Sequence, residues 1–248
     1  MQVVNFMSEN VREILVIVEG AKTDIRLMER LLMLYGIDGR HQIVSYNTNI
    51  YLLYNSIFND PDPESLDILL HLKSREPNPD KRAVLDRRYS EVLLIFDFDP
   101  QDPHFADEKI KKMMGFFSES TEMGKLYINY PMIEAFYHMK NIPDSDFNSY
   151  IATMNELESG LYKDRVNKET RIGDYAKYPV NKNEASIIIR QNINKAWHIL
   201  LSKTDESIAP PDSMSILEVQ LAKREHEKVI AILCTCIFYI VDYNPMLL

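Results

Sequence analysis

The chain has 248 residues, of which 46% are hydrophobic and 26% are charged. These proportions exclude a disordered or fibrous protein, and the length is enough for one large or two small domains with a sizeable core. The formal net charge of −9 argues against a broadly basic surface that coats nucleic acid, but not against an acidic site that binds phosphate through a metal.

Neither the first ten residues nor the longest apolar run has the pattern expected of a targeting or membrane segment. Residues 1–10 lack the basic, apolar and small-residue order of a secretory signal, and the longest apolar run, Val229 to Val241, is shorter than the roughly 18 to 20 residues that cross a bilayer. We therefore expect a cytoplasmic protein without a membrane segment. The run predicts the buried second half of a helix over 215–241, in which Cys234 and Cys236 are reduced core residues that point in different directions.

The first elements form a strand, a tight turn and a helix. The apolar run Ile14 to Val18 predicts a buried strand that ends at Glu19 and Gly20. Between residues 25 and 35 the apolar positions recur every three or four residues, which is typical of one helix face, and Gly36 is placed to end that helix. This arrangement opens a right-handed βαβ unit, so we expect the chemistry at the turn.

A second strand is predicted over 42–46, followed by a helix over 48–58 that Asn47 caps. The segment over about 59–90 is rich in proline and charge, and it predicts a mobile insertion around one short amphipathic piece over 65–73. Its basic residues are candidates for a patch that contacts phosphate, although a solvated loop explains them equally well. These residues are Lys73, Arg75, Lys81, Arg82, Arg87 and Arg88.

The central feature of the chain is the run Glu91 to Asp102, in which buried apolar residues end abruptly in acids. Residues 92–96 predict an interior strand of a parallel sheet that is covered on both faces. Because side chains alternate along a strand, we expect Asp97 and Asp99 on the same side at its carboxyl end. Two adjacent carboxylates repel each other, so this arrangement requires a cation or a shared proton between them.

The chain after this strand predicts a helix over 107–119, a fourth strand over 125–129 and a helix over 132–140. The last helix would place Glu134 and His138 on one face. An acid at that position is expected near a metal site, although a helix-start acid that interacts with backbone amides is almost as common. His138 is more typical of a packed residue than of a general base.

Beyond residue 141 the strand patterns disappear, and the chain predicts helices around a polar loop over 163–182. The best defined of these helices has apolar residues at helical spacing from Ile189 to Leu200. We therefore expect a catalytic domain over 1–140, which includes the insertion, and a helical C-terminal region over 141–248 packed on it. The predicted fold class is α/β, with a parallel sheet of about four strands flanked by helices.

The ends of the predicted strands carry Glu19, Asp97, Asp99 and Glu134, and the carboxyl ends of parallel strands meet in one crevice. Four oxygen ligands suit Mg²⁺ or Mn²⁺, and a pair of such ions can hold the attacking and leaving oxygens of a phosphodiester. The sequence therefore predicts a metal site at this edge. Lys22, in the turn after Glu19, could contact phosphate there, although an exposed first-turn lysine is the more common case.

Three segments resemble Toprim domains. Residues 18–24, Val-Glu-Gly-Ala-Lys-Thr-Asp, resemble their first motif, in which a strand delivers a Glu-Gly pair to a turn and a helix. Asp97-Phe98-Asp99 resembles their Asp-x-Asp motif. Residues 129–136 are similar to the segment after a strand in the small Toprim proteins of bacterial defence systems, so the resemblance covers about residues 12–138.

The resemblance implies a Toprim-like fold and a nuclease that cuts DNA or RNA in antiviral defence under the control of a separate ATPase. It implies that Glu19 and Asp97 are catalytic, that Asp99 helps them to hold Mg²⁺ or Mn²⁺, and that Glu134 is a further ligand. Asp102, after the second motif, either adds to the site or caps the next helix. The alternatives are a non-catalytic regulatory module that docks on a partner and a primase-like enzyme. Homo-oligomer formation stays open.

Overall fold

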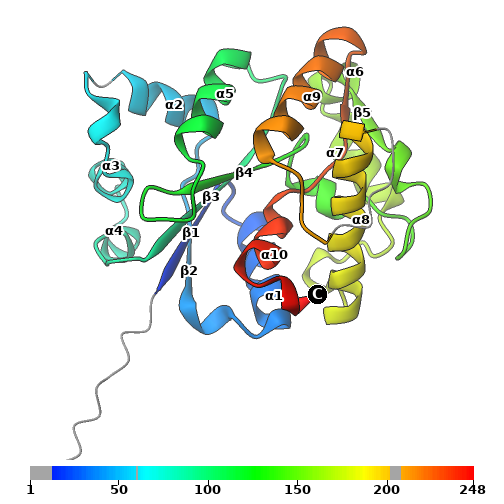
Figure 1. Ribbon diagram of the computed structural model, residues 1–248, viewed down its shortest axis with the longest axis horizontal. Helices are drawn as coiled ribbons and strands as arrows, with labels where there is room; N and C mark the ends of the chain where they lie inside the picture. Colours follow the sequence, from blue (N-terminus) through cyan, green and yellow to red (C-terminus); the bar gives the residue numbers. More distant parts are fainter. Residues whose placement is uncertain (1–12, 60, 202–207) are drawn as a thin grey trace, which may run out of the picture.

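The computed structural model describes residues 13–59, 61–201 and 208–248. Its centre is a sheet of four parallel strands in the order β2-β1-β3-β4, which confirms the α/β prediction (Figure 1). The central strands β1 and β3 are apolar and buried because helices cover both faces of the sheet. All four carboxyl ends lie at one edge, here named the carboxyl edge. The strands are β1 (Ile14–Val18), β2 (His41–Ser45), β3 (Glu91–Asp97) and β4 (Lys125–Asn129).

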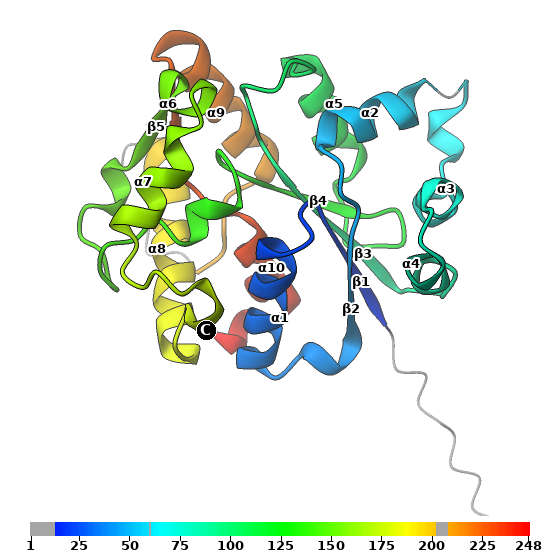
Figure 2. The same cartoon turned by 180° about the vertical axis from the view of Figure 1, so that it is seen from behind.

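Helices α1 (Thr23–Tyr35) and α10 (Tyr239–Tyr243) lie on one face of the sheet. Helices α2 (Ile50–Phe58) and α5 (Asp107–Phe116) lie on the opposite face, and the view from behind shows the same two layers (Figure 2). Most of the apolar positions predicted for the first helix are buried in α1, which ends at Gly36. The predicted helix face is therefore the face that packs on the sheet.

The loop that joins β2 to α2 differs from the prediction. The N-terminal cap of α2 is Asn49, whose side chain accepts a hydrogen bond from the Leu52 N–H, and the cap is not Asn47. Asn47 has left-handed backbone (φ 58°), and its N–H donates to the Glu19 carbonyl at 3.0 Å. Asn47 therefore continues the hydrogen bonding between β1 and β2 instead of starting the helix.

The insertion forms two short helices, α3 (Ile68–Arg75) and α4 (Pro79–Leu85), where the sequence predicted one amphipathic piece. Both helices have side-chain caps, because Asp67 accepts from Leu70 N–H and Asn78 accepts from the first turn of α4. Proline at the first position of α4 is compatible with a helix start, so the prolines of this segment mark helix boundaries.

The segment after β4 is not the predicted α-helix over 132–140. A 3-10 turn forms at Ile133–Phe136, and every residue from 131 to 139 is buried. An amphipathic helix needs a face that contacts solvent, and this segment has none. Glu134 and His138 therefore do not share a helix face: Glu134 pairs with Lys163, and His138 bonds to Glu169.

The C-terminal region is mainly helical, as predicted, and it also contains two strands that were not predicted. β5 and β6 pair in antiparallel fashion, so the expectation of no strand beyond residue 141 was wrong. Helix α7 occupies the first part of the predicted polar loop over 163–182. The elements are β5 (Ile151–Thr153), α6 (Met154–Glu158), α7 (Leu161–Glu169), α8 (Lys182–Leu201), α9 (Ser213–His226) and β6 (Val229–Ala231).

The predicted helix over 215–241 ends at His226, and Lys228 has left-handed backbone (φ 59°). All residues from 229 to 241 are buried, and a uniformly buried run does not distinguish a strand from a helix. The amide of Gln220 on α9 bonds to both the N–H and the C=O of Ala231, at 2.9 and 2.8 Å, and thereby holds β6 beside α9.

Cys234 and Cys236 are free, buried cysteines as predicted, but they do not lie in the predicted α-helix: Cys234 is in the segment after β6, and Cys236 begins the 3-10 turn Cys236–Phe238. Their sulfur atoms are 3.4 Å apart, so they do not point in different directions. Tyr130 and Leu233 form an antiparallel bridge that joins this segment to the chain just after β4. Helix α8 also packs against α1, and α9 packs against α5, so the C-terminal region lies directly against the sheet layers.

In the described part of the chain, no helix combines the length and the apolar character needed to cross a membrane. Short 3-10 turns, in addition to the one after β4, lie at Asp38–Arg40, Pro63–Ser65, Phe147–Ser149, Tyr175–Lys177, Cys236–Phe238 and Pro245–Leu247.

Candidate metal centre

Glu19 is fixed at the carboxyl edge by its backbone. Its N–H donates to the Ile95 carbonyl at 3.1 Å, and its own carbonyl accepts from Asn47 N–H at 3.0 Å. These bonds continue the sheet by one residue beyond β1 on both sides. The side chain of Glu19 therefore starts from a rigid position between the ends of β2 and β3.

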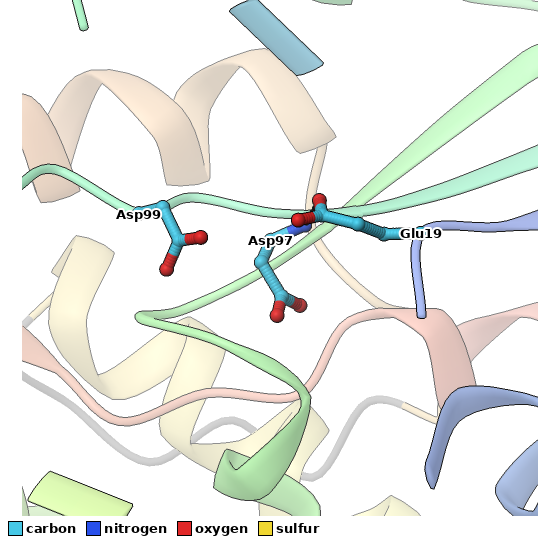
Figure 3. Close-up of side chains that lie close together, drawn as sticks. All are labelled: Glu19, Asp97 and Asp99. Carbon is cyan, nitrogen blue, oxygen red and sulfur yellow. Dashed lines mark hydrogen bonds between the residues drawn. The ribbon is translucent and has the colours of Figure 1, made fainter. Parts of the chain in front are cut away.

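Asp97 and Asp99 come from the end of β3. Strand alternation does not place Asp99, because β3 ends at Asp97 and Asp99 has a left-handed backbone (φ 38°). Hydrogen bonds from Phe98 N–H to the Asn129 carbonyl and from Asp99 N–H to the Pro131 carbonyl, at 3.0 and 3.1 Å, shape this turn. The turn brings the Asp99 carboxylate to the same site as Asp97 (Figure 3).

One carboxylate oxygen from each of Glu19, Asp97 and Asp99 lies within 4.8 Å of the other two. Ligands on opposite sides of a divalent ion, each about 2.0 to 2.6 Å from it, are roughly 4 to 5 Å apart. The three oxygens can therefore bind one ion together. The sequence prediction that the fold gathers these three acids is confirmed, and we name them the acid cluster.

The hydrogen bonds of the acid cluster leave one oxygen without a partner. Glu19 accepts from Asp97 N–H at 3.1 Å, and Asp99 accepts from the side chain of Gln101 at 3.0 Å. Asp97 is only 8% exposed, and its Oδ1 has no hydrogen-bond partner among the described residues. A buried carboxylate oxygen without a partner is costly unless a cation or a proton accompanies it. The cluster thus fits a divalent metal ion.

Burial sets the titration of the acid cluster. Burial raises the pKa of Glu19 to about 8, and the charges of Asp99 and Asp24 act in the same direction. The pKa of Asp97 lies well above its ordinary value for the same reason, with repulsion from Asp99 and Glu19 added. Burial also raises the pKa of Asp99 to about 6, against the hydrogen bond from Gln101. Without a cation, the cluster therefore holds protons near neutral pH.

The acid cluster lies in a cleft of about 480 Å³ that Lys22, Asp24, Gln101, Glu134 and Lys163 also line. Glu134, predicted as a fourth ligand, is 9% exposed, and its Oε1 lies 3.3 Å from the Lys163 Nζ. Its Oε2 is buried and has no hydrogen-bond partner in the described part of the chain. Glu134 thus shares the cleft but is not one of the three acids that converge. Lys22 is exposed and lines the cleft, so its predicted contact with phosphate stays a prediction.

Asp24 is a cleft residue to which the sequence assigned no role. It lies in the first turn of α1, is 5% exposed, and accepts a 3.1 Å hydrogen bond from Gly20 N–H. A Cβ atom on Gly20 would lie 2.5 Å from the Asp24 carboxylate, so a larger residue here would have to displace the Asp24 side chain. Burial raises the pKa of Asp24. The sequence feature that could have identified Asp24 is its position as an acid in the first helical turn after the Glu-Gly pair.

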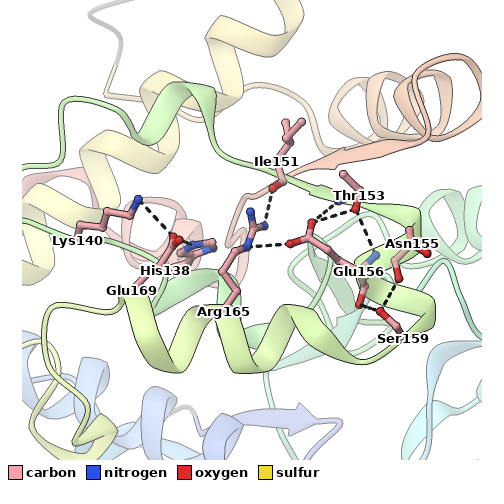
Figure 4. Close-up of polar contacts among 9 residues, drawn as sticks. All are labelled: His138, Lys140, Ile151, Thr153, Asn155, Glu156, Ser159, Arg165 and Glu169. Atoms are coloured by element: carbon pink, nitrogen blue, oxygen red, sulfur yellow. Dashed lines mark hydrogen bonds and ion pairs between the residues drawn. The ribbon is translucent and has the colours of Figure 1, made fainter.

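Lys163 is the second missed residue, and it reaches the cleft from α7. Arg165 and Glu169 anchor this helix: Arg165 donates to the Ile151 carbonyl at 2.6 Å, and His138 Nε2 lies 2.9 Å from the Glu169 carboxylate (Figure 4). Burial lowers the pKa of Lys163, but attraction to Glu134 and the acid cluster outweighs it and raises the pKa overall. The buried His138 thus holds α7 in place and lies outside the cluster.

The other predicted basic contacts do not reach the cleft. Arg87 pairs with Glu13 at 2.5 Å, and Glu13 directly precedes β1 at the opposite edge of the sheet. Glu19 lies six positions after Glu13, which is roughly 20 Å along an extended strand at about 3.3 Å per residue. Arg88 lines a groove beside α3 together with Arg87, and Arg82 is exposed on α4. Of the four predicted nucleic-acid contacts, the structure brings only Lys22 to the acid cluster.

Asp102 lies outside the acid cluster. Its carboxylate accepts hydrogen bonds from the Asn49 side chain and the His104 N–H, both at 2.7 Å. It therefore supports the turn after β3 and does not cap α5, whose N-terminal cap position is Ala106.

The fold and site define an α/β protein with a carboxylate cluster at the carboxyl edge of a parallel sheet. No family model matches the chain, and no curated protein and no solved structure is significantly similar to it. The resemblance to Toprim domains therefore depends on the three sequence segments alone.

Proposed function

We propose that the protein is a phosphodiester nuclease that depends on Mg²⁺ or Mn²⁺. The observation that carries the proposal is the convergence of Glu19, Asp97 and Asp99 within 4.8 Å, with an unpartnered, buried oxygen on Asp97. Hard divalent ions prefer such oxygen ligands. The Toprim resemblance supports the same assignment, because these three acids are the acids of its two motifs.

The acid cluster would hold the ion, and Glu134 and Asp24 supply further carboxylates in the same cleft. A bound Mg²⁺ or Mn²⁺ polarises phosphoryl oxygens and makes water a better nucleophile at neutral pH. Lys22 and Lys163, which line the cleft, would attract the phosphate backbone of the substrate. Gln101 would orient Asp99 through its 3.0 Å hydrogen bond.

On the Toprim resemblance alone, we further propose that the nuclease acts in antiviral defence and that a partner ATPase controls it. If the partner is needed to activate the nuclease, the isolated chain is silent, whereas a partner that only restrains the nuclease leaves the isolated chain active. Cleavage is therefore best measured on the purified chain first, and then with a candidate partner ATPase.

The test measures cleavage of double-stranded DNA, single-stranded DNA and RNA with Mg²⁺, Mn²⁺ or EDTA. We expect cleavage with either metal and none with EDTA, and Glu19→Gln and Asp97→Asn should each abolish it. Asp38→Asn is the matched control, because Asp38 is an exposed acid at the amino end of β2. Equal cleavage by the wild type and the two cluster variants would refute the site. Metal binding without cleavage of any substrate would instead favour a non-catalytic module.

A further inference from the structure

A second pocket, of about 310 Å³, lies along the carboxyl edge next to the cleft. Tyr46, Asn47 and Thr48, which follow β2, line one part of it, and Arg75 and Pro77 from the insertion line another. Asn47 connects the pocket with the acid cluster, because its N–H donates to the Glu19 carbonyl. Since β2 is the neighbour of β1, the pocket begins about 4.8 Å from the strand that carries Glu19.

The cation of this pocket is Arg75, the last residue of α3. It is exposed, and its Nη1 contacts His71 Nδ1 and Ser74 Oγ at 3.2 and 3.3 Å. Among the described residues, no carboxylate lies within ion-pair distance of its guanidinium. Two other cations of the same insertion differ, because Lys73 pairs with Asp86 and Arg87 pairs with Glu13. Arg75 therefore keeps donors for an anion.

Tyr46 supplies an aromatic wall. Its ring is half-buried and packs against the core, so its position is fixed while it still lines the pocket. The neighbouring acid, Glu76, is 9% exposed, and its Oε1 accepts a 2.9 Å hydrogen bond from Asn78 N–H, so it is engaged with its own loop. Proteins bind single-stranded nucleic acid by stacking bases on aromatic side chains and by contacting the backbone with cations.

We propose that this pocket binds a nucleotide that flanks the cleavage position in a single-stranded nucleic acid, with its base against Tyr46 and its phosphate at Arg75. The proposal rests on the proposed function and specifies its substrate. The strand would cross the carboxyl edge from the Lys163 side, past the acid cluster, to the end of β2. In a duplex the bases stack on one another, so Tyr46 selects for a single strand.

The test measures binding of fluorescent oligothymidylate, oligouridylate and a duplex of equal length. Ca²⁺ replaces Mg²⁺, and a gel checks that the oligonucleotides stay intact. We expect Arg75→Ala to weaken single-strand binding several-fold and to reduce the slope of log K against log salt by about 0.7, the effect of one lost phosphate contact. Tyr46→Ala should weaken binding roughly 5- to 100-fold, whereas Tyr46→Phe should stay within about 2-fold, because stacking needs the ring and not the hydroxyl.

Arg40→Ala is the matched control, because Arg40 is exposed at the amino end of β2, whereas Arg75 lies at its carboxyl end. Arg75 is an exposed residue, so we expect Arg75→Ala to fold, and a folding defect of Tyr46→Ala would not prevent a decision. Comparison of oligothymidylate with oligouridylate shows whether the pocket prefers DNA or RNA. Unchanged single-strand binding by Arg75→Ala or by Tyr46→Ala would overturn the proposal. So would an equal loss of duplex binding in these variants, or no binding of any oligonucleotide by the wild type.

This inference and the proposed function fail in different ways. If Glu19→Gln abolishes cleavage while the Arg75 and Tyr46 variants bind and cut as the wild type does, the nuclease stands and the pocket assignment is wrong. If single-strand binding depends on Arg75 and Tyr46 but no metal supports cleavage, the pocket assignment stands and the nuclease is wrong.

Discussion

The backbone N–H of Asp97 donates a 3.1 Å hydrogen bond to the Oε2 atom of Glu19, across 78 residues of sequence. The bond joins the ends of two neighbouring strands, so the position of Glu19 depends on the register of β1 against β3, which pairs Val18 with Ile95. Metal binding through Glu19 would therefore depend on the order of the central sheet, and loss of that order would separate the three acids of the acid cluster.

The raised pKa of Glu19 predicts how stability depends on pH without metal. Between about pH 4.5 and 8, the folded protein holds a proton on Glu19 that the unfolded chain has released, so the free energy of unfolding should fall as pH rises. Thermal unfolding in EDTA across this range checks it. Glu19→Gln should make the fall of the free energy of unfolding with pH less steep, by an amount that corresponds to about one proton. With saturating Mn²⁺, the decline should disappear, because the ion takes the place of the protons. A rise of stability with pH in EDTA would contradict this explanation.

Metal affinity should depend on the residue that orients Asp99. Gln101→Ala removes the 3.0 Å hydrogen bond to Asp99 and should lower the affinity for Mn²⁺ about 10-fold, which is typical of a residue that supports a ligand. Titration calorimetry at constant pH measures the change. Gln42→Ala, a half-exposed glutamine on β2 far from the carboxyl edge, is the control. An affinity equal to that of the wild type would show that Gln101 does not support the site.

Lys163 should have opposite effects on metal and on substrate. Its ammonium group lies in the cleft 3.3 Å from Glu134, so Lys163→Ala removes a positive charge that repels a divalent ion. We expect several-fold tighter Mn²⁺ binding and slower cleavage, because the phosphate backbone loses a cation. Lys168→Ala on the same helix provides the control, since Lys168 is exposed and does not line the cleft. If the Mn²⁺ affinity and the cleavage rate both fall in Lys163→Ala, the side chain stabilises the folded structure and has no direct effect on metal or substrate.

Gly20 should be required for the close approach to Asp24. A methyl group on Gly20 would lie 2.5 Å from the Asp24 carboxylate, so Gly20→Ala should lower the free energy of unfolding by roughly 1 to 3 kcal/mol. Denaturant unfolding measures it. Gly39→Ala is the control, because no described atom lies within 4 Å of a Cβ there. The double variant Gly20→Ala/Asp24→Ala should recover part of the loss, and no recovery would mean that the strain lies elsewhere.

The sequence predicts the sheet well because its strands are local patterns, and it predicts that the strand ends bring Glu19, Asp97 and Asp99 together, although a turn and not strand alternation places Asp99. β1, β3 and β4 are short apolar runs that end in polar residues, and α1 has a clear apolar face. The segments over 131–139 and 229–241 were mispredicted because they are buried on all sides, so they carry no periodic signal. Lys163 was missed because its position depends on the tertiary contacts of α7, which no spacing in the sequence reports.

The segment with Cys234 and Cys236 connects the C-terminal region to the acid cluster through hydrogen bonds to Asn129. The Asn129 side-chain oxygen accepts from the Cys236 N–H at 3.2 Å and from the Cys234 thiol at 3.4 Å, and the Asn129 backbone carbonyl accepts from the residue between Asp97 and Asp99. A fragment cut after residue 140 would keep every acid of the cluster and lose both donors. The shortest working form of this protein is therefore expected to extend at least through Cys236. A fragment limited to the acidic motifs should lose the order of the turn that carries Asp97 and Asp99.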